Sequence, residues 1–208
     1  MSASERETRI VRLPPASQEG VISLEESVAG RRSVRRYAAE PLTLSQLSQL
    51  LWAAQGLTSG TGLRAAPSAG ATYPMEVFVL AGESSVEGLA AAIYHYRADT
   101  HSMKVHAPHD ARAALAEAAL GQGFVARAPA VIALCATYER TSRTYGPRAN
   151  RYVHMEAGHI GENISLQAVA LGLATVMVGA FEDDAVADVL GLPRDVRPLY
   201  IIPVGRPR

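Results

Sequence analysis

The stretch at residues 156–173, EAGHIGENISLQAVALGL, predicts the long helix around which the rest of the fold is arranged. We expect this helix to run from about residue 150 to residue 171. Its small residues recur at spacings of three and four, which places them on one stripe of the helix surface: Ala157, Gly161, Ser165, Ala168 and Gly172. A glycine inside a helix costs about 1 kcal/mol relative to alanine, so close packing must compensate. The stripe therefore predicts a central helix that another helix can approach closely, as at a subunit interface.

Strand patterns lie on both sides of this helix in the chain. Residues 129–136, PAVIALCA, form a continuous apolar run, which predicts a strand that is buried on both faces. Residues 94–106 alternate around a turn at Ala98-Asp99 and predict a hairpin. Three further strands are expected at residues 75–81, 174–179 and 198–205.

Two helix starts precede the first of these strands. Ser23 followed by Glu26 is a capping-box pattern, which predicts a helix that ends near Gly30. Thr43 opens a second helix that ends at Gly56. Its apolar residues fall on one stripe: Leu44, Leu47, Leu50, Leu51 and Ala54.

Two further helices complete the pattern, one capped by Asp110 that ends near Gly121 and one after Asp183. Helices and strands do not alternate regularly, so the pattern favours an α+β domain. The chain shows no internal repeat and no linker, which predicts a single domain over residues 1–208. Residues 1–20 carry charge and no clear period, so we expect a loose arm or one that embraces a partner.

The composition limits the class of protein. Hydrophobic residues make up 48% of the 208 residues and charged residues 19%, as in a globular protein. Twenty basic and twenty acidic residues argue against a general nucleic-acid binder, which has a basic surface. The polar N-terminus resembles no signal peptide, no apolar run reaches the ~20 residues of a membrane helix, and the one cysteine cannot form an internal disulfide. Together these features predict a cytoplasmic protein without a nucleic-acid or membrane partner.

Residues 31–37, RRSVRRY, place four arginines and a serine within seven positions. Guanidinium groups offer forked donors that match phosphate geometry, and serine adds a short hydroxyl donor. In a chain of zero net charge this local excess favours a small anion held at one point. The alternative interpretation is a solvated basic loop end.

Residues 67–74, PSAGATYP, lead directly into the strand at residues 75–81. Small side chains let the backbone approach a ligand, and Gly70 permits unusual dihedral angles. No lysine follows in the arrangement of a phosphate-binding P-loop, so that kind of site is excluded. A ligand-binding loop and a long turn both remain open.

Two candidate chemistries are weak. Glu156 and His159 have the Glu-x-x-His spacing of di-iron bundles, but the chain has no second such pair, so we expect no metal site. Cys135 lies within an apolar strand and is expected to be an inert core residue.

The arginine cluster, the Pro-Ser loop before a strand and the Gly-rich helix occur in a fixed order. In this order they resemble the nitroreductase-like flavoprotein family, and PSAGATYP and EAGHIGENISLQAVALGL are most similar to its SagB-type branch, which includes thiazole- and oxazole-forming dehydrogenases. The resemblance runs from about residue 23 to the last residue. It implies a nitroreductase-like α+β fold, with a central mixed sheet flanked by helices, in an intertwined homodimer that binds FMN at its interface.

The resemblance also assigns residues to the two ends of the flavin. For the phosphate it implies Arg31, Ser33 and Arg35, with Arg32 beside them, and in the final GRPR Arg206 and then Arg208. For the isoalloxazine ring it implies Ser68, Ala69 and Gly70 from the partner subunit, and Gly179 and Ala180 in the segment MVGAF.

The activity implied is that of an FMN-dependent oxidoreductase. A hydride would pass from NAD(P)H to the flavin and then to a small organic acceptor. Because a flavin performs the hydride chemistry at its N5 atom, no catalytic acid or base is required of the protein, and we assign none.

One position departs from the azoline-oxidising members, which carry a Lys-Tyr pair shortly before the central helix. The counterpart here is Thr144-Tyr145, so the lysine is missing. Tyr145 remains a candidate proton donor or pocket wall, and we favour the pocket wall. A peptide-modifying, azoline-type dehydrogenase and a non-catalytic flavin-binding module therefore stay open as alternatives.

Overall fold

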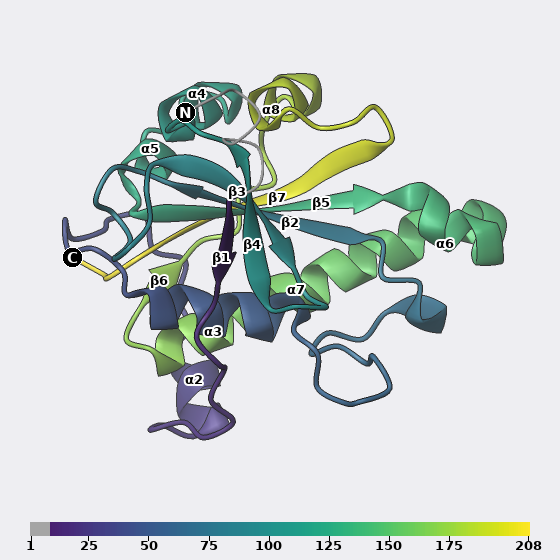
Figure 1. The fold of residues 1–208 in the computed structure, drawn as a ribbon, viewed down its shortest axis with the longest axis horizontal. Coiled ribbons are helices and arrows are strands. Elements are labelled where there is room, and N and C mark those ends of the chain that lie inside the picture. Colours follow the sequence, from purple (N-terminus) through teal and green to yellow (C-terminus); the bar gives the residue numbers. More distant parts are fainter. Residues whose placement is uncertain (1–8) are drawn as a thin grey trace.

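The structure, a computed structural model, describes residues 9–208 and is built on one seven-stranded sheet with helices on both faces (Figure 1). The strands are β1 (Ile10–Arg12), β2 (Met75–Ala81), β3 (Ala92–Arg97), β4 (Ser102–Ala107), β5 (Ala130–Thr137), β6 (Ala174–Thr175) and β7 (Val196–Gly205). The helices are α2 (Leu24–Gly30), α3 (Leu44–Gln55), α4 (Arg112–Ala118), α5 (Phe124–Arg127), α6 (Tyr138–Tyr145), α7 (Ala149–Ala170) and α8 (Asp183–Leu190). Short 3-10 helices occupy Ala69–Ala71 and Gly146–Arg148. The strand order is β1-β4-β3-β2-β5-β7-β6, and the α+β fold is confirmed.

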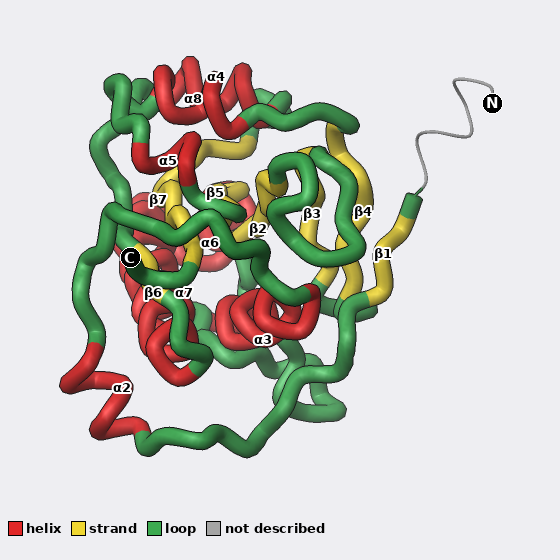
Figure 2. The backbone as a smooth tube through the Cα atoms, turned by 90° about the vertical axis from the view of Figure 1, so that its left-hand side faces the viewer, coloured by secondary structure: helices red, strands yellow, loops and turns green. Residues whose placement is uncertain are grey.

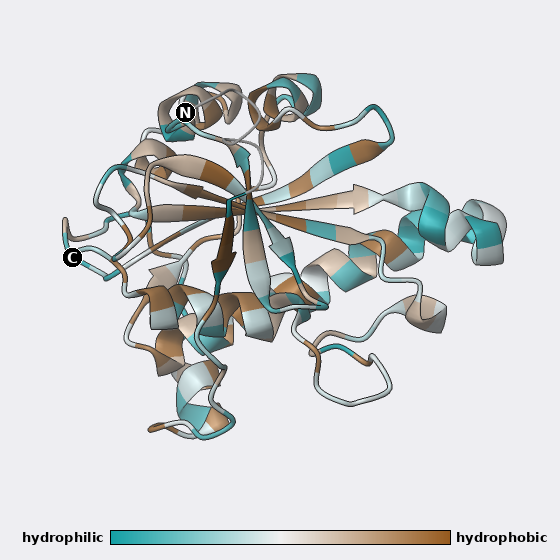
Figure 3. Ribbon diagram, viewed as in Figure 1, coloured by the Kyte–Doolittle hydropathy of each residue, from teal (hydrophilic) through white to brown (hydrophobic). Residues whose placement is uncertain are grey.

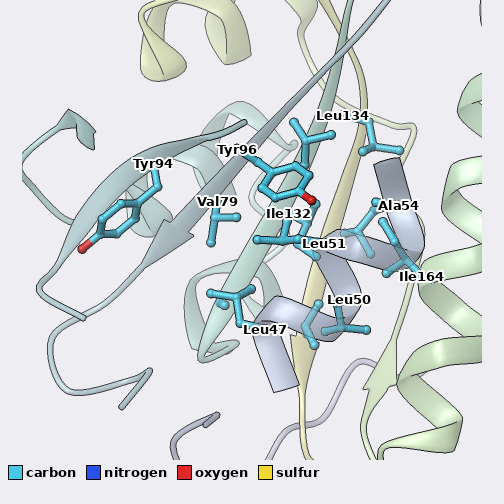
Figure 4. Close-up of a cluster of buried hydrophobic side chains, with 14 of the residues drawn as sticks. Leu47, Leu50, Leu51, Ala54, Val79, Tyr94, Tyr96, Ile132, Leu134 and Ile164 are labelled. Carbon is cyan, nitrogen blue, oxygen red and sulfur yellow. The ribbon is translucent and has the colours of Figure 1, made fainter. Parts of the chain in front are cut away.

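Helices α3 and α7 cover one face of the sheet (Figure 4). Leu51 of α3 and Ile164 of α7 pack against Val79 of β2 and Ile132 of β5. All four side chains are completely buried. This face therefore forms the larger core and fixes α7 beneath the sheet.

Helices α4, α5 and α8 cover part of the other face, at the top of Figure 1. Leu115 of α4 and Val125 of α5 pack against Leu80 and Val131 of the sheet. Strand β5 lies in the middle of both layers, and every one of its residues is buried. Apolar residues concentrate on the strands and on the helix sides that face them, whereas α6 is mostly hydrophilic (Figure 3). No helix within residues 9–208 has both the length and the apolar content that a membrane span requires.

The predicted helix starts are confirmed in atomic detail. The Ser23 hydroxyl accepts a hydrogen bond from Glu26 N, and the Glu26 carboxylate accepts one from Ser23 N. Thr43 and Gln46 exchange the same two hydrogen bonds at the start of α3. Each box satisfies two backbone donors that a helix end otherwise leaves unpaired.

Helix α7 confirms the central helix, but its small-residue stripe serves a different contact from the one we expected. A Cβ atom added to Gly161 would lie 2.4 Å from Met177 Sδ. The Ser165 and Thr175 hydroxyl oxygens are 3.4 Å apart. The chain's own segment around β6 therefore covers the stripe. Gly172 lies beyond the helix end with φ +68°, where the left-handed conformation suits glycine and no helix stability is lost.

Four other expectations need correction. Every ladder between neighbouring strands is antiparallel, and parallel pairing within residues 9–208 is limited to isolated bridges, so the sheet is not mixed. The strand expected at residues 174–179 is only the two-residue β6. Ala111 caps α4, although the Asp110 carboxylate still accepts a hydrogen bond from Arg112 N. Residues 10–12 of the expected loose arm form β1, which pairs with β4, and residues 1–8 lie outside the described part.

Candidate functional site

The arginine segment and the last residues of the chain lie side by side at the β6 edge of the sheet (Figure 2). Val34 N donates to the Thr175 carbonyl at 3.0 Å, and Ala38 N donates to the Arg206 carbonyl at 3.0 Å. The ring of Tyr37 packs against Gly205, where an added Cβ would lie 2.9 Å from Tyr37 Cδ1. This close packing brings together the two stretches of basic residues that the sequence places far apart.

The guanidinium groups of this edge carry more charge than their partners neutralise. Arg31 Nε lies 3.8 Å from Glu162 Oε1, and Arg206 Nε lies 3.0 Å from Glu40 Oε2. Within residues 9–208 these are the carboxylates that form ion pairs with the cluster. Arg206 Nε is also buried without a hydrogen bond of acceptable geometry. Arg35 lies over the Phe124 ring, 5.8 Å from its centre.

Three other basic or hydroxyl residues surround them. Arg32 Nη1 donates to the Ala29 carbonyl at 2.9 Å. Ser33 is exposed and bridges to β6 through its backbone. Arg208 N donates to the Arg36 carbonyl at 3.2 Å. The cluster is therefore a cationic edge with a fixed backbone and several donors that face solvent.

The PSAGATYP loop forms a second, separate group of candidate residues. Tyr73 N donates to the Ser68 hydroxyl at 3.0 Å, which closes the loop around the 3-10 helix Ala69–Ala71. Gly70 has φ +58°, a conformation that glycine adopts without strain. A Cβ on Gly70 would lie 2.6 Å from the Tyr145 hydroxyl, so Tyr145 forms the wall beside this loop.

The two groups lie near different turns of α7 in one chain. The PSAGATYP loop reaches Glu156, which lies close to Ser68. The arginine edge reaches Glu162 and, through Gly30, the side chain of Val169. At 1.5 Å per residue, Glu156 and Glu162, the ion-pair partner of Arg31, are about 9 Å apart along the helix axis. In one chain, Ser68–Gly70 and the arginines therefore lie beside different turns of α7.

Gly179 and Ala180 belong to the arginine side. They follow β6, whose Thr175 contacts the arginine segment, and Val178 bridges to Ile201 of β7. Both residues are exposed. The Ala180 carbonyl accepts a hydrogen bond from Gln122 Nε2 at 2.9 Å, which fixes this piece of backbone at the surface.

An ion-pair cluster around the half-buried Glu76 joins β2, β3 and α6. The Glu76 carboxylate accepts hydrogen bonds from Arg140 and contacts His95 Nε2 at 2.6 Å. Burial alone would raise the pKa of Glu76, but the His95 hydrogen bond and the Arg140 charge outweigh it, so this pKa is lowered. The position of Glu76 within a strand of otherwise buried residues was the signal in the sequence that could have indicated a charged partner.

A second carboxylate is buried beneath the PSAGATYP loop. Glu156 is 2% exposed, contacts Ser68, and receives a 3.5 Å hydrogen bond from Gln55 Nε2. Burial raises the pKa of Glu156 above its ordinary value despite these hydrogen bonds and the nearby Arg64 charge. Sequence reasoning considered this residue only as a metal ligand, whereas its position on the buried stripe of α7 is the better indication of its role.

The opposite pKa shifts of the two carboxylates predict opposite pH dependence of stability. The pKa of Glu76 is lower in the folded state than its ordinary value of 4.5, so ionised Glu76 stabilises the fold at pH values above 4.5. This stabilisation is lost as the pH falls through the folded pKa. The pKa of Glu156 is higher in the folded state, so the fold favours its protonated form and is most stable at low pH. That stabilisation is lost as the pH rises from 4.5 through the folded pKa. We therefore expect Glu76→Gln to destabilise the protein at pH 7 by about 1–3 kcal/mol and Glu156→Gln to be neutral or stabilising there.

Urea unfolding of wild type and both variants at pH 4, 5.5 and 7 measures these effects. The difference between wild type and Glu76→Gln should shrink toward pH 4, because protonation removes the same charge as the substitution. Ionisation of Glu156 should lower the free energy of unfolding of wild type relative to Glu156→Gln only toward pH 7. Parallel pH profiles for all three proteins would contradict both assignments.

Metal and thiol chemistry find no support here. Across residues 9–208, His, Cys, Asp and Glu side chains form no group of three or more that could hold a metal ion. Glu156 is buried and His159 exposed, so the Glu-x-x-His pair does not converge. Cys135 is completely buried, and burial raises the pKa of its thiol.

Known proteins share both the sequence and the fold. The chain is 44% identical over 200 residues to a protein of Methanocaldococcus jannaschii that is provisionally named a nitroreductase, covering 96% of this chain and 98% of that protein. It is 31% identical over 133 residues to the trifolitoxin-processing protein TfxB of Rhizobium leguminosarum bv. trifolii, which is 62% of this chain and 35% of TfxB. A crystal structure provisionally described as a nitroreductase from Ralstonia eutropha superimposes with a TM-score of 0.84 at 28% identity, covering 100% of this chain and 92% of that one.

The family itself is identified by a match over most of the chain. A model of the Nitroreductase family matches residues 28–206, from the helix before the arginine cluster to Arg206. The fold, the long relative and this match agree, and the chain belongs to the Nitroreductase family.

Proposed function

We propose that this protein is an FMN-dependent oxidoreductase of the SagB-type branch, which passes a hydride from NAD(P)H through the flavin to a small organic acceptor. The observation that carries the proposal is the cationic edge at β6, where backbone hydrogen bonds bring the arginine segment beside Thr175 and Arg206 from distant parts of the chain. A bound FMN supplies the hydride-transfer chemistry. The chain's own residues supply binding, orientation and shielding from water.

The cationic edge fits a phosphate group. A phosphate carries nearly two negative charges and three acceptor oxygens. Arg206 is present at this edge with its Nε paired to Glu40, and the backbone here is fixed by hydrogen bonds to β6. Arg31, Ser33, Arg35 and Arg206, with Arg32 beside them, would hold the phosphate through charge-assisted hydrogen bonds.

The flavin ring would lie between two backbone surfaces. Gly179 and Ala180 would approach it from the chain that holds the phosphate. Ser68, Ala69 and Gly70 of the partner subunit would close the other side, because the same residues of one chain lie beside a different turn of α7 from the arginine edge. Tyr145, beside Gly70, would exclude water from the ring as a pocket wall.

A homodimer is part of the proposal. Large apolar side chains are exposed on α2, on the segment before it and on α7: Val21, Leu24, Val28 and Met155. Exposed apolar residues that gather on one segment, as Val21, Leu24 and Val28 do, mark interaction surfaces, and a second copy of the chain would bury them. We place the protein in the cytoplasm, in agreement with its charge balance and its single, buried cysteine.

Purification and anaerobic reduction test the function directly. We expect a yellow protein that releases FMN on denaturation, is bleached by NADH or NADPH, and is reoxidised by a quinone or nitroaromatic. Light scattering after gel filtration should give twice the chain's mass of 22.1 kDa. A protein that gains no flavin spectrum on incubation with FMN would overturn the proposal, and one that binds FMN without reduction by any donor would be a flavin-binding module.

The similarity to TfxB favours one second candidate, a peptide-modifying dehydrogenase that oxidises azoline rings with oxygen as the acceptor. This activity predicts turnover of peptide azolines in the absence of nicotinamide. Thr144 stands where azoline-oxidising members carry lysine, so the first candidate remains preferred. Azoline oxidation without NAD(P)H oxidation would reverse that preference.

A further inference from the structure

A cavity of about 340 Å³ lies at the end of β2 and β3, next to the C-terminus of α3. Its lining includes Arg64, Arg97 and Arg140, together with Glu76 and Asp99. A volume of this size, lined by a few convergent polar groups, is typical of a small-molecule site. None of these residues belongs to the proposed flavin contacts.

Two of the three guanidinium groups in this cavity are neutralised by neighbours. Arg97 Nη2 lies 3.3 Å from Asp99 Oδ2. Arg140 is paired with Glu76, and it also donates to the Tyr73 carbonyl at 3.0 Å. These two arginines therefore have their charges balanced within the protein.

Arg64 differs from both. Its Nη1 donates to Gln55 Oε1 at 2.6 Å, and its guanidinium carbon lies 4.4 Å from the centre of the Tyr73 ring. Both contacts hold the side chain in place, but neither supplies a full negative charge. Arg64 forms no ion pair with a carboxylate anywhere in residues 9–208.

The surroundings of Arg64 keep this charge uncompensated. Gln55 is 1% exposed and uses its amide nitrogen to donate to Glu156, so its oxygen stays turned toward Arg64. Glu156 is the carboxylate beyond Gln55, and it forms a hydrogen bond with Gln55 and no ion pair with Arg64. The cavity therefore presents one fixed guanidinium with an excess charge of about one unit.

We infer that this cavity binds a small organic molecule that carries one carboxylate, with Arg64 as its anion-binding residue. The carboxylate would form charge-assisted hydrogen bonds with Arg64, and the rest of the ligand would lie against Tyr96 and the end of β2. Tyr73, whose ring supports Arg64, donates its N–H to Ser68. The cavity is thus adjacent to the loop that the proposed function places against the flavin.

Binding is tested with a matched pair of probes. Fluorine NMR titrations with 4-fluorobenzoate and with uncharged 4-fluorobenzamide should show binding of the carboxylate and weak or no binding of the amide. Arg64→Gln should raise the Kd for 4-fluorobenzoate by about tenfold or more. Arg97→Gln, which changes a paired arginine of the same cavity, should alter it by less than about twofold. Arg64→Lys, which keeps the charge, should retain part of the affinity.

Circular dichroism and urea midpoints of all variants verify that they are folded. Equal affinity of wild type and Arg64→Gln for 4-fluorobenzoate, or no binding by wild type, would overturn the inference. These titrations do not depend on flavin, so they remain decisive if the proposed function fails. That function is needed only to identify the source of the carboxylate.

Kinetics separate a substrate from an effector. If the carboxylate belongs to the electron acceptor, Arg64→Gln should raise KM for 4-nitrobenzoate and leave KM for 4-nitrobenzamide unchanged. If it belongs to a separate effector, neither KM should change while 4-fluorobenzoate binding is still lost. Both outcomes support the site and assign its ligand.

Discussion

The double variant Arg31→Gln/Arg35→Gln is expected to lose nearly all of its bound flavin. Each charge-assisted hydrogen bond to a phosphate contributes about 1.5–3 kcal/mol, so removing two guanidinium groups should weaken FMN binding by about a hundredfold or more. Arg206 and Ser33 would remain but could not balance two negative charges. Fluorescence titration of the flavin-free protein with FMN measures the change.

Riboflavin provides the matched ligand control because it has the same ring and no phosphate. Wild type should prefer FMN strongly, whereas the double variant should bind both ligands with similar, weak affinity. Arg197→Gln is the matched protein control, since Arg197 pairs with Asp184 away from the cluster. An unchanged FMN preference in the double variant would show that the arginine segment does not hold the phosphate.

Ile132→Ala is expected to give a similarly large loss in the free energy of unfolding. Ile132 lies in β5 between the two helix layers and is completely buried, so truncation leaves a cavity that rigid neighbours on both sides cannot fill. We expect a loss of about 2–5 kcal/mol. Chemical denaturation of the flavin-free protein measures it without a contribution from the ligand, and one fixed chain concentration keeps the contribution of dimerisation equal for all variants.

The same substitution at an exposed isoleucine is the control. Ile10 in β1 is 59% exposed, and Ile10→Ala should cost less than about 1 kcal/mol. Comparable losses at the two positions would contradict the buried position of β5.

The sequence predicted elements whose signals are local. The Ser23–Glu26 and Thr43–Gln46 boxes act between residues three positions apart, and both helices begin where expected. The apolar run of β5 is equally local, because a strand covered on both faces needs no alternation. The length of β6 was overestimated. Val176 and Val178 are buried as strand residues are, but they do not continue the hydrogen-bonded ladder between β6 and β7.

Contacts between distant segments could not be predicted in the same way. Met177, which follows the helix by several residues, fills the space that Gly161 leaves open, yet a stripe of small residues is equally compatible with a second subunit. The Glu76–His95–Arg140 cluster joins three elements separated by long stretches of chain. Glu76, within a buried strand, was the one indication of this cluster in the sequence, and only the sheet register and the placement of α6 bring its partners to it.

From the sequence we could propose the basic residues of the candidate site but not their layout, and their role as phosphate ligands stays a prediction. The arginine edge follows from residue types that match a phosphate. The position of Arg64 could not be inferred, since it depends on Gln55 and Tyr73 holding one guanidinium away from every carboxylate. Such a charge is recognised only when the surrounding partners are known.

The separation of the arginine edge from the Ser68–Gly70 loop along α7 has a genetic consequence. In the proposed dimer each chain contributes its arginine edge to one flavin site and its Ser68–Gly70 loop to the other. A dimer of an Arg31→Gln/Arg35→Gln chain with a Gly70→Val chain would therefore contain one site made of two intact halves and one made of two altered halves. Two alleles that each abolish flavin binding alone should then complement each other when they are co-expressed, which no pair of alterations within one half of the site can do.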